Sequence, residues 1–311
     1  MAGDGFEEQR RYLTAVAYRL LGSVADAEDA VQDAWLRWRT VDRASVQDPR
    51  AYLTRVVTRI CYDMLGSARA RREAYYGEWL PEPVLTKGEA DGAGQSPEEL
   101  ATLGESFSFA MLAVMEQLSP AERAAFVLHD VFAVGFEEIA AALEKSPDAA
   151  RQLASRARRR VRERHGAQPR GERGPVGRAE HRKVVEAFAA ATRHGDLPAL
   201  LTVLAPGVVW HSDGGGAVRG AGVRPVVTAD RVSRLLAGLG AKWLHADMAF
   251  EFAEVNGDPG LILHDERGVL IGVFAFAVED GRIVEAYASL NPAKLAHLPG
   301  GGEISHHLRP Q

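Results

Sequence analysis

The sequence predicts a multidomain protein in which two all-α domains are followed by an α+β domain. At a prior of roughly 150 residues per domain, a chain of 311 residues holds two or three domains. Apolar residues recur every three or four positions through the first half, which is typical of helices. From about residue 179, helices give way to strand-like segments. With 46% apolar and 25% charged residues, the composition excludes a wholly disordered or fibrous chain.

Three helices are expected in the first domain, residues 1–72. Leu13, Val16 and Leu20 share one face of the first helix, which ends at a turn at Gly22. The second helix is expected from about residue 25 to 39. Pro49 starts the third helix, because proline is well tolerated in a first helical turn.

Residues 73–97 break the helical pattern with glycine, proline and acidic residues, and they are expected to form a linker. The linker nevertheless contains Tyr75, Tyr76, Trp79 and Leu80, which a merely flexible tether would not need. They either pack on a neighbouring domain of the same chain or form a recognition segment. We favour packing within the chain, because exposed aromatic clusters tend to mark contact surfaces.

A second helical domain is expected over residues 98–165. Ser96 and Ser119 are each followed by proline and, three residues on, by glutamate, the signature of a capped helix start. Further along, residues 136–143 and 147–164 form two helices separated by a short turn, with Ser146 able to cap the second. Two helices joined in this way predict a helix-turn-helix, whose second helix can enter a major groove.

After a second linker, residues 166–178, the pattern predicts an α+β domain over 179–298. Helices are expected at 180–193, 197–204 and 228–239, and the apolar residues 208–210 precede the glycine run. Strands follow at 246–254, 260–264, 269–279 and 282–290, with hairpin signals between them. This order predicts helices packed on one curved sheet. The tail, residues 299–311, is expected to be disordered.

Several classes of protein are excluded by composition. No stretch approaches the roughly 20 apolar residues that cross a bilayer, and the acidic N-terminus does not resemble a signal peptide, so we expect a cytoplasmic protein with no membrane partner. The single cysteine, Cys61, excludes an intramolecular disulfide and a cysteine-based zinc cluster. We expect no metal and no cofactor.

The net charge of −5 hides basic segments that suit nucleic acid. Residues 147–164 hold seven arginines against two acids, a density that favours DNA binding over an ordinary solvated helix. Arginine pairs with guanine edges, glutamine with adenine, and the remaining arginines neutralise phosphates. The residues expected to contact DNA are Arg151, Gln152, Ser155, Arg156 and Arg159.

Residues 55–72 form a second basic segment, with five arginines against one acid. Arginines interleaved with Tyr52 and Tyr62 suit a single strand or an opened duplex, where bases stack on rings. An ordinary amphipathic helix is an equally good interpretation of these residues alone. Residues 26–33 instead hold four acids near a helix N-terminus, which the helix dipole favours.

The first 165 residues resemble an extracytoplasmic-function (ECF) sigma factor of RNA polymerase. GSVADAEDAVQDAWLRW resembles the core-polymerase-binding part of region two, and PRAYLTRVVTRICYDMLGSARARRE resembles the helix that melts and reads the −10 element. Residues 118–163 resemble region four, which reads the −35 element. Typical −10 helices have Trp and Asn where this chain has Tyr52 and Arg59.

The resemblance implies core RNA polymerase, through its β′ clamp helices and β flap, and promoter DNA as partners. The residues implied in polymerase binding are Asp26, Glu28, Asp29, Val31, Gln32, Asp33, Trp35 and Leu36. The residues implied in −10 binding are Tyr52, Arg55, Arg59, Asp63, Arg69, Arg71 and Arg72.

The whole chain resembles the subgroup of these sigma factors with a C-terminal SnoaL-like (NTF2-like) cone domain. Three motifs carry the resemblance, although Ala217 and Ala293 stand where the subgroup has lysine and aspartate. The motif residues are Trp79, Leu80, Pro81, Glu82, Pro83, Asp213, Gly214, Gly215, Gly216, Asn291, Pro292, Lys294 and Leu295. In the subgroup the extension regulates the sigma factor in cis, so no separate anti-sigma factor is expected.

The C-terminal domain leaves three functions open: a structural clamp, which we favour, a sensor with a small ligand in an apolar pocket, and an enzyme such as a cyclase or isomerase. Candidates for a general base are His211, Asp213, His245, Asp247 and His264. The glycine run 214–216 predicts positive φ angles or a close approach of another segment, such as the linker. The alternative for the whole chain is a stand-alone helix-turn-helix regulator with such a C-terminal domain; our principal expectation is a sigma factor without enzymatic activity.

Overall fold

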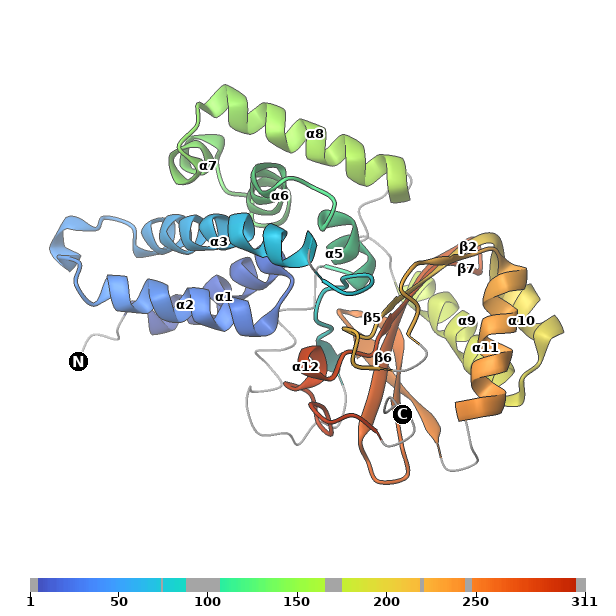
Figure 1. The fold of residues 1–311 in the computed structure, drawn as a ribbon. Helices are drawn as coiled ribbons and strands as arrows, with labels where there is room; N and C mark the ends of the chain where they lie inside the picture. Colours follow the sequence, from blue (N-terminus) through green and yellow to red (C-terminus); the bar gives the residue numbers. More distant parts are fainter. Residues whose placement is uncertain are drawn as a thin grey trace. The chain divides into compact units, whose positions relative to one another are not determined.

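The computed structural model describes residues 5–73, 75–87, 107–165, 175–218, 221–243 and 248–305, with backbone alone at 68–73, 87, 164–165, 175–176, 240–243 and 249. The chain forms two compact units. The helical unit comprises Met1–Ala74 and Met111–Pro169, and the mixed unit comprises Tyr75–Ala110 and Arg170–Gln311. The predicted fold class is confirmed, because helices alone build the first unit and helices with one sheet build the second (Figure 1).

Three helices open the helical unit, as the sequence predicts: α1 (Glu7–Leu21), α2 (Val24–Trp38) and α3 (Pro49–Glu73). Gly22 ends α1 in a left-handed conformation with φ 70°, and the Ser23 side chain accepts a hydrogen bond from the Asp26 amide to cap α2. A short 3₁₀ turn, η1 (Arg43–Ser45), precedes α3. Leu13, Leu20 and Leu53 are among the largest side chains that are fully buried in the unit.

The second group of helices follows α5 (Phe109–Met115), along which the chain passes from one unit to the other. The elements are α6 (Pro120–Phe126), the π-helical turn η2 (Val127–Val131), α7 (Phe136–Leu143) and α8 (Pro147–His165). Ser119 and Glu122 cap α6 reciprocally, and Ser146 accepts a hydrogen bond from the Ala149 amide at the start of α8. The predicted helix-turn-helix is therefore confirmed as α7 and α8. The Ser96 cap lies outside the described residues.

Both groups of helices share the core of the helical unit. The rings of Tyr12 and Phe132 meet edge to face with their centroids 5.3 Å apart, and the Arg19 guanidinium lies 5.0 Å from the Phe132 centroid. Burial lowers the pKa of Arg19 to about 10, because the charged form loses hydration there. Helix α3 also packs against α6 and α7, so the helix expected at the −10 element contacts the helix-turn-helix.

The mixed unit contains a seven-stranded sheet with the order β1-β4-β5-β6-β7-β2-β3. Its strands are β1 (Leu85–Lys87), β2 (Leu204–Asp213), β3 (Val226–Val227), β4 (Ala249–Val255), β5 (Asp258–His264), β6 (Leu270–Glu279) and β7 (Arg282–Ser289). Every pairing is antiparallel except that of β2 with β7. The four predicted C-terminal strands are observed as β4 to β7.

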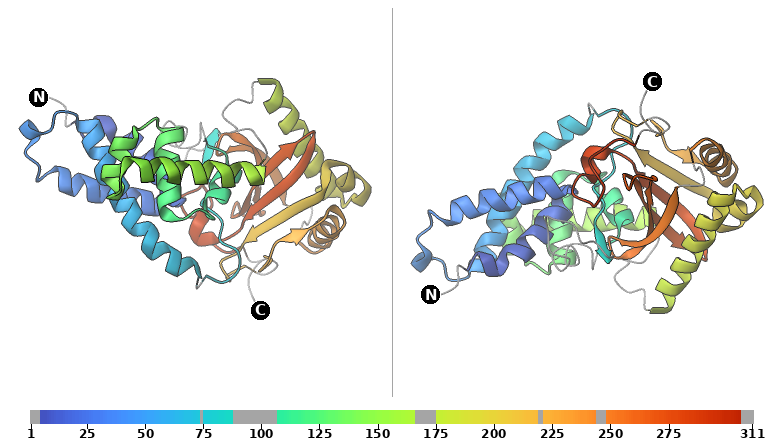
Figure 2. Two further views of the ribbon diagram at one scale, coloured as in Figure 1. Left: turned by 90° about the horizontal axis from the view of Figure 1, so that it is seen from above. Right: turned by 90° about the horizontal axis from the view of Figure 1, so that it is seen from below.

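Helices α9 (Pro175–His194), α10 (Leu197–Val203) and α11 (Ala229–Trp243) cover one face of the curved sheet, as the views in Figure 2 show. Phe188 of α9 and Val232 of α11 belong to one buried apolar cluster with Trp210 and Phe276 of the sheet. A short helix, α12 (Pro292–Leu295), follows β7. No helix within the described ranges is both long and apolar enough to span a bilayer.

Two segments expected to be irregular are ordered parts of the mixed unit. Residues 85–87 of the expected linker pair with β4 as strand β1. The disorder expected for the tail does not hold for residues 299–305, because the Gly300 carbonyl accepts a hydrogen bond from the Leu270 amide and Ser305 is buried against Asp265. Residues 306–311 lie outside the described part of the chain.

Candidate functional site

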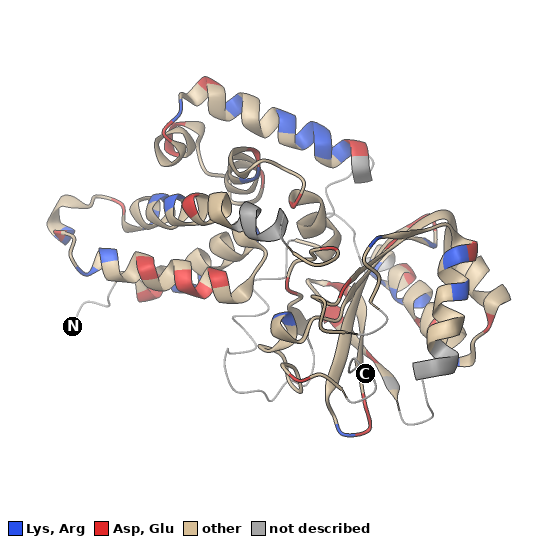
Figure 3. Ribbon diagram, in the orientation of Figure 1, with Lys and Arg blue, Asp and Glu red and all other residues tan. Residues whose placement is uncertain are grey.

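Helix α8 presents an open polar stripe that contains every residue expected to contact the −35 element. Spacings of three and four residues place these side chains on one side of the helix. We call Arg151, Gln152, Ser155, Arg156 and Arg159 the α8 stripe; all five are exposed. The opposite side, including Leu153 and Val161, is buried in the helical unit. Figure 3 shows basic residues gathered along α8.

The arginines of the α8 stripe pair with carboxylates of the same unit. Arg151 Nη1 lies 2.6 Å from Asp148 Oδ1, and Arg156 Nε lies 3.4 Å from Glu122 Oε1. Both arginine side chains are 49% exposed. Water screens the pair of Arg151 with the exposed Asp148, so this pair contributes little to stability. Glu122 is only 6% exposed, but it keeps Arg160 and Ser119 as partners when Arg156 leaves it. These guanidinium groups can therefore exchange a carboxylate for a DNA phosphate or base edge at low cost.

The described residues of the expected −10 site lie along α3 and are less open than the α8 stripe. The Tyr52 ring is half-buried with its centroid 5.8 Å from that of Trp38, and the Arg55 guanidinium lies 5.6 Å from the Tyr52 centroid. Arg59 Nη1 lies 2.8 Å from Glu144 Oε1, and Arg59 Nε lies 3.5 Å from Asp63 Oδ1.

Glu144 lies in the turn between α7 and α8, with a left-handed φ of 53°. Its hydrogen bond with Arg59 raises the pKa of the Arg59 guanidinium, so this residue is charged throughout the physiological range. From the sequence we recognised this turn but not the ion pair, because the partners are distant in the chain. The side chains of Arg69, Arg71 and Arg72 lie outside the described residues.

Helix α2 presents the surface expected to bind polymerase. Glu28, Asp29 and Asp33 are exposed, and the acidic residues form a visible row on α2 in Figure 3. Gln32 is exposed and Leu36 is 47% exposed. Asp26 and Trp35 are partly buried.

Val31 is the exception within this set. Its side chain is only 2% exposed, because position 31 falls on the stripe of α2 that faces the bundle core. We therefore correct the expectation for Val31 and assign it to packing. The remaining members form what we call the α2 surface: Asp26, Glu28, Asp29, Gln32, Asp33, Trp35 and Leu36.

A buried polar network in the mixed unit joins the linker to the C-terminal sheet. At its centre is Asp213, at the end of β2, whose side chain is fully buried. Asp213 Oδ1 accepts hydrogen bonds from the Tyr75 hydroxyl at 2.6 Å and the Gly215 amide at 3.1 Å. Asp213 Oδ2 accepts from the Leu80 amide at 2.9 Å and from Lys294 Nζ at 2.6 Å. Both oxygens of this carboxylate are thus occupied within the chain.

Lys294 of α12 completes the network. Its ammonium group also donates to the Leu80 carbonyl and lies 3.1 Å from the Trp79 ring centroid, a cation–π geometry. Asn291 Nδ2 donates to the Tyr75 hydroxyl at 2.7 Å. Burial, and then the neighbouring Asp213 carboxylate, raise the pKa of the Tyr75 hydroxyl, so it remains a donor. Three motifs that are distant in sequence therefore meet around one ion pair.

The glycine run is shaped as the sequence predicts. Gly215 and Gly216 have φ angles of 59° and 74°, which residues with a Cβ rarely adopt. A Cβ on Gly215 would lie 2.4 Å from Asn291 Nδ2, and one on Gly216 would lie 3.1 Å from the Tyr76 ring. The expectation of positive φ and of close approach to the linker is confirmed at Gly216. At Gly214 an added Cβ would lie 2.4 Å from the Ala221 Cβ.

The remainder of the linker motif is also held by the mixed unit. His211 Nδ1 lies 2.6 Å from Glu78 Oε1, and the His211 ring stacks on Tyr287 with centroids 4.9 Å apart. His297 Nε2 lies 2.8 Å from the Pro83 carbonyl oxygen. The other motif residues that are buried here are Leu80, Pro81, Glu82, Pro83 and Leu295, and Trp79 and Pro292 are partly buried.

The three described candidates for catalysis, His211, Asp213 and His264, do not form one open site. Asp213 is occupied by four donors, and the buried His211 faces Glu78. His264 lies apart from them, with its Nδ1 atom 4.0 Å from Glu251 Oε2. His245 and Asp247 fall outside the described residues. Among the residues that are described, no cluster of three or more histidine, cysteine or carboxylate side chains could hold a metal ion.

Comparison with known families finds sigma factor regions in both helical segments. Residues 6–71 match Sigma-70 region 2, and residues 108–161 match Sigma-70, region 4. A stand-alone helix-turn-helix regulator would not need region 2, so the presence of both matches favours the sigma factor over that alternative.

Relatives extend the similarity to the whole chain. The chain is 42% identical over 304 residues to the ECF RNA polymerase sigma factor SigJ of Mycobacterium tuberculosis (strain ATCC 25618 / H37Rv), covering 94% of this chain and 93% of that protein. It is 34% identical over 298 residues to the probable ECF RNA polymerase sigma factor SigI of Mycobacterium tuberculosis (strain CDC 1551 / Oshkosh), covering 94% and 95%. The crystal structure of the Mycobacterium tuberculosis sigma factor SigJ matches with a TM-score of 0.75 at 38% identity, covering 95% of this chain and 98% of that one.

Proposed function

The chain belongs to the family of extracytoplasmic-function RNA polymerase sigma factors, and we propose which of its surfaces bind polymerase and DNA and which segment regulates it. A sigma factor directs core RNA polymerase to specific promoters and starts transcription. The observation that carries the assignment is the α8 stripe, an exposed basic face on the second helix of a helix-turn-helix. That arrangement suits insertion into a major groove.

The α8 stripe reads the −35 element. Arg151 and Gln152 lie in the second turn of α8, and N-terminal residues of a recognition helix are the ones that reach base edges. Arg156 and Arg159 follow one and two turns later, where a helix in the groove meets phosphates. The stripe therefore supplies both base-reading and phosphate-neutralising groups.

Helix α3 contacts the −10 element, and the α2 surface binds the β′ clamp helices of core polymerase. Arg55 is exposed and the Arg59 side chain is 34% exposed, so both can reach a phosphate after exchange of a partner. Before it can bind a phosphate, Arg59 must break its ion pair with Glu144. The acids of the α2 surface precede two apolar side chains on the same helix, Trp35 and Leu36, and this combination of charge and apolar area suits a protein partner.

The C-terminal part of the chain regulates the sigma factor in cis by holding the linker. Residues 75–84 lie between the −10 helix and the −35 helix in the sequence, and the Asp213 network binds them to the mixed unit. When these residues are bound to the mixed unit, fewer linker residues are free to extend between α3 and α8. The network thereby sets the range over which α3 and α8 can separate on promoter DNA.

The proposal is tested by promoter affinity of the reconstituted holoenzyme. Arg151→Ala and Gln152→Ala should each weaken specific binding by about 1–3 kcal/mol if the side chain reads a base. Competition against unrelated DNA separates this loss from a general loss of charge. Arg182→Ala is the matched control, because Arg182 is an exposed, ion-paired arginine on α9. Unchanged promoter affinity in both α8 variants would remove this stripe from the interface.

A further inference from the structure

Two arginines outside the α8 stripe, Arg158 and Arg160, lie on opposite flanks of α8. They are two residues apart, which in an α-helix is a rotation of about 200° around the axis. On the same helical geometry the α8 stripe covers an arc of about 140°, and each of the two arginines lies about 90–110° from the centre of that arc. The stripe is therefore bordered by one arginine on each side.

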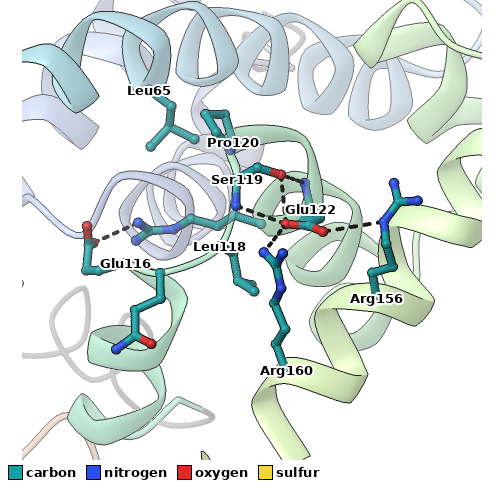
Figure 4. Close-up of a pocket in the computed structure, with 10 residues that line it drawn as sticks. Leu65, Glu116, Leu118, Ser119, Pro120, Glu122, Arg156 and Arg160 are labelled. Carbon is teal, nitrogen blue, oxygen red and sulfur yellow. Dashed lines mark hydrogen bonds and ion pairs between the residues drawn. The ribbon is translucent and has the colours of Figure 1, made fainter.

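Arg160 is held on its flank by a carboxylate with a fixed position. Arg160 Nη1 lies 2.7 Å from Glu122 Oε2, and the Glu122 side chain is only 6% exposed (Figure 4). The amide and hydroxyl of Ser119 donate to the same oxygen at 3.1 and 2.8 Å, which ties Glu122 to the start of α6. The Arg160 side chain is itself 49% exposed, so the rest of its guanidinium group is accessible to a ligand.

Glu122 remains charged in this setting. Burial raises the pKa of Glu122, but hydrogen bonds from Ser119 and the charges of Arg160 and Arg156 outweigh it and hold the pKa below its ordinary value. Glu122 is therefore an anion at physiological pH, and it keeps Arg160 as a partner when Arg156 engages DNA.

Arg158 is held on the opposite flank in the same way. Arg158 Nε lies 2.6 Å from Asp130 Oδ1, in the π-helical turn η2, and the two side chains are 33% and 25% exposed. This bond occupies Nε alone, and the other nitrogens of a guanidinium group carry further N–H donors. Because the side chain is already ordered, a ligand that binds these donors loses less conformational entropy than one that binds a free arginine.

The two flanks of α8 match the two walls of a major groove. The groove is about 12 Å wide, and an α-helix with its side chains is about 10–12 Å across. When the α8 stripe faces the base edges at the floor of the groove, each flank faces the sugar-phosphate backbone of one strand. A guanidinium group on each flank can thus meet a phosphate of each strand.

We propose that Arg158 and Arg160 contact backbone phosphates of the two DNA strands on either side of α8, while Asp130 and Glu122 keep hold of them. The inference rests on the proposed function of α8 and adds two contacts to it. Each arginine retains its carboxylate through one nitrogen and donates to a phosphate through the others. Phosphate contacts fix the position of a protein on the duplex, so this pair sets the register in which the α8 stripe meets the bases.

The salt dependence of promoter binding by the reconstituted holoenzyme tests these contacts. Loss of one phosphate contact makes the slope of log affinity against log salt concentration less steep by about 0.9. Arg158→Gln and Arg160→Gln should each change the slope by this amount and weaken binding about tenfold at fixed salt, the worth of one hydrogen bond to a charged group. Arg158→Lys and Arg160→Lys keep the charge and should keep the wild-type slope. Arg182→Gln, at an exposed and ion-paired arginine of α9, is the matched control and should leave the slope unchanged.

The slope separates a DNA contact from a merely structural role. A variant that unfolds part of the protein lowers the apparent affinity by a constant factor and leaves the slope as it was. An unchanged slope in either glutamine variant, an equal change in Arg182→Gln, or a slope lost in the lysine variants as well would overturn the two-sided contact.

A second measurement separates this inference from base reading by the α8 stripe. Promoters with single base pairs of the −35 element changed should be discriminated as in the wild type by Arg158→Gln and Arg160→Gln, because phosphates carry no sequence information. Arg151→Ala should lose discrimination at one base pair. If it does so while both glutamine variants keep the wild-type slope, only the flank contacts are overturned. If Arg151→Ala and Gln152→Ala both bind as the wild type does, base reading is overturned instead.

Discussion

Arg156 on α8 and Lys294 in α12 both pair with a carboxylate, but the Arg156 side chain is 49% exposed and that of Lys294 is 5% exposed. Arg156 can exchange Glu122 for a phosphate because its own guanidinium group is half exposed, and the buried Glu122 carboxylate keeps Arg160 and Ser119 as partners. If Lys294 left Asp213, the Asp213 carboxylate would remain charged and unpaired inside the mixed unit, which is costly. Helix α8 thus keeps Arg156 available for a partner, whereas the mixed unit uses the Asp213–Lys294 pair to hold the linker.

The largest effect is expected from breaking the buried pair. Asp213→Ala leaves Lys294 buried without its counter-ion, and removal of one partner of such a pair costs about 3–5 kcal/mol. Hydrogen exchange of the amides in β6 and β7 measures the opening free energy of the mixed unit in the full chain.

The matched control for that change is Glu186→Gln on α9. Glu186 pairs with Arg182 at 2.9 Å, and both side chains are exposed. An exposed pair of this kind contributes about 0–1 kcal/mol. A loss of less than 1 kcal/mol in Asp213→Ala would mean that the ion pair does not hold the unit together.

A smaller effect is expected from the glycine run. Gly215→Ala places a Cβ in a left-handed conformation, which costs about 1–2 kcal/mol, and it also displaces Asn291. The same hydrogen-exchange measurement applies. Gly238→Ala in α11 is the opposite control, because an added Cβ there meets nothing and alanine favours helix by up to about 1 kcal/mol. If both variants lowered stability equally, the conformation at Gly215 would not be the cause.

The helices, the helix-turn-helix and the strands β4 to β7 could be predicted from sequence because each depends on local signals. Apolar spacing and the caps at Ser119 and Ser146 lie within a few residues of the elements they define. Strand β1 was not predicted, because its three residues gain their structure from Val255 and Glu254, far along the chain. The parallel pairing of β2 with β7 is non-local in the same way.

The residues of the Asp213 network could be predicted from the sequence, but the hydrogen bonds and ion pair between them could not. The motifs point to Asp213, Trp79 and Lys294, but only the fold brings the Lys294 ammonium between the Asp213 carboxylate and the Trp79 ring. The buried ion pair of Arg123 with Glu116, 2.7 Å apart, was not predicted from the sequence. A signal was present, since Arg123 directly precedes the apolar run AAFVL, and an arginine on a buried helix face needs an acceptor.

The most direct test of linker control is run-off transcription by polymerase reconstituted with Tyr75→Phe, set against Tyr76→Phe. The Tyr75 hydroxyl donates to Asp213 and accepts from Asn291, so its removal loosens the linker by about 1 kcal/mol without removing the ring. Tyr76 is 67% exposed, and its variant is the matched control. Transcript yield should change with Tyr75→Phe and stay at the wild-type level with Tyr76→Phe. Wild-type yield from Tyr75→Phe, or equal changes in the two variants, would contradict control through the held linker.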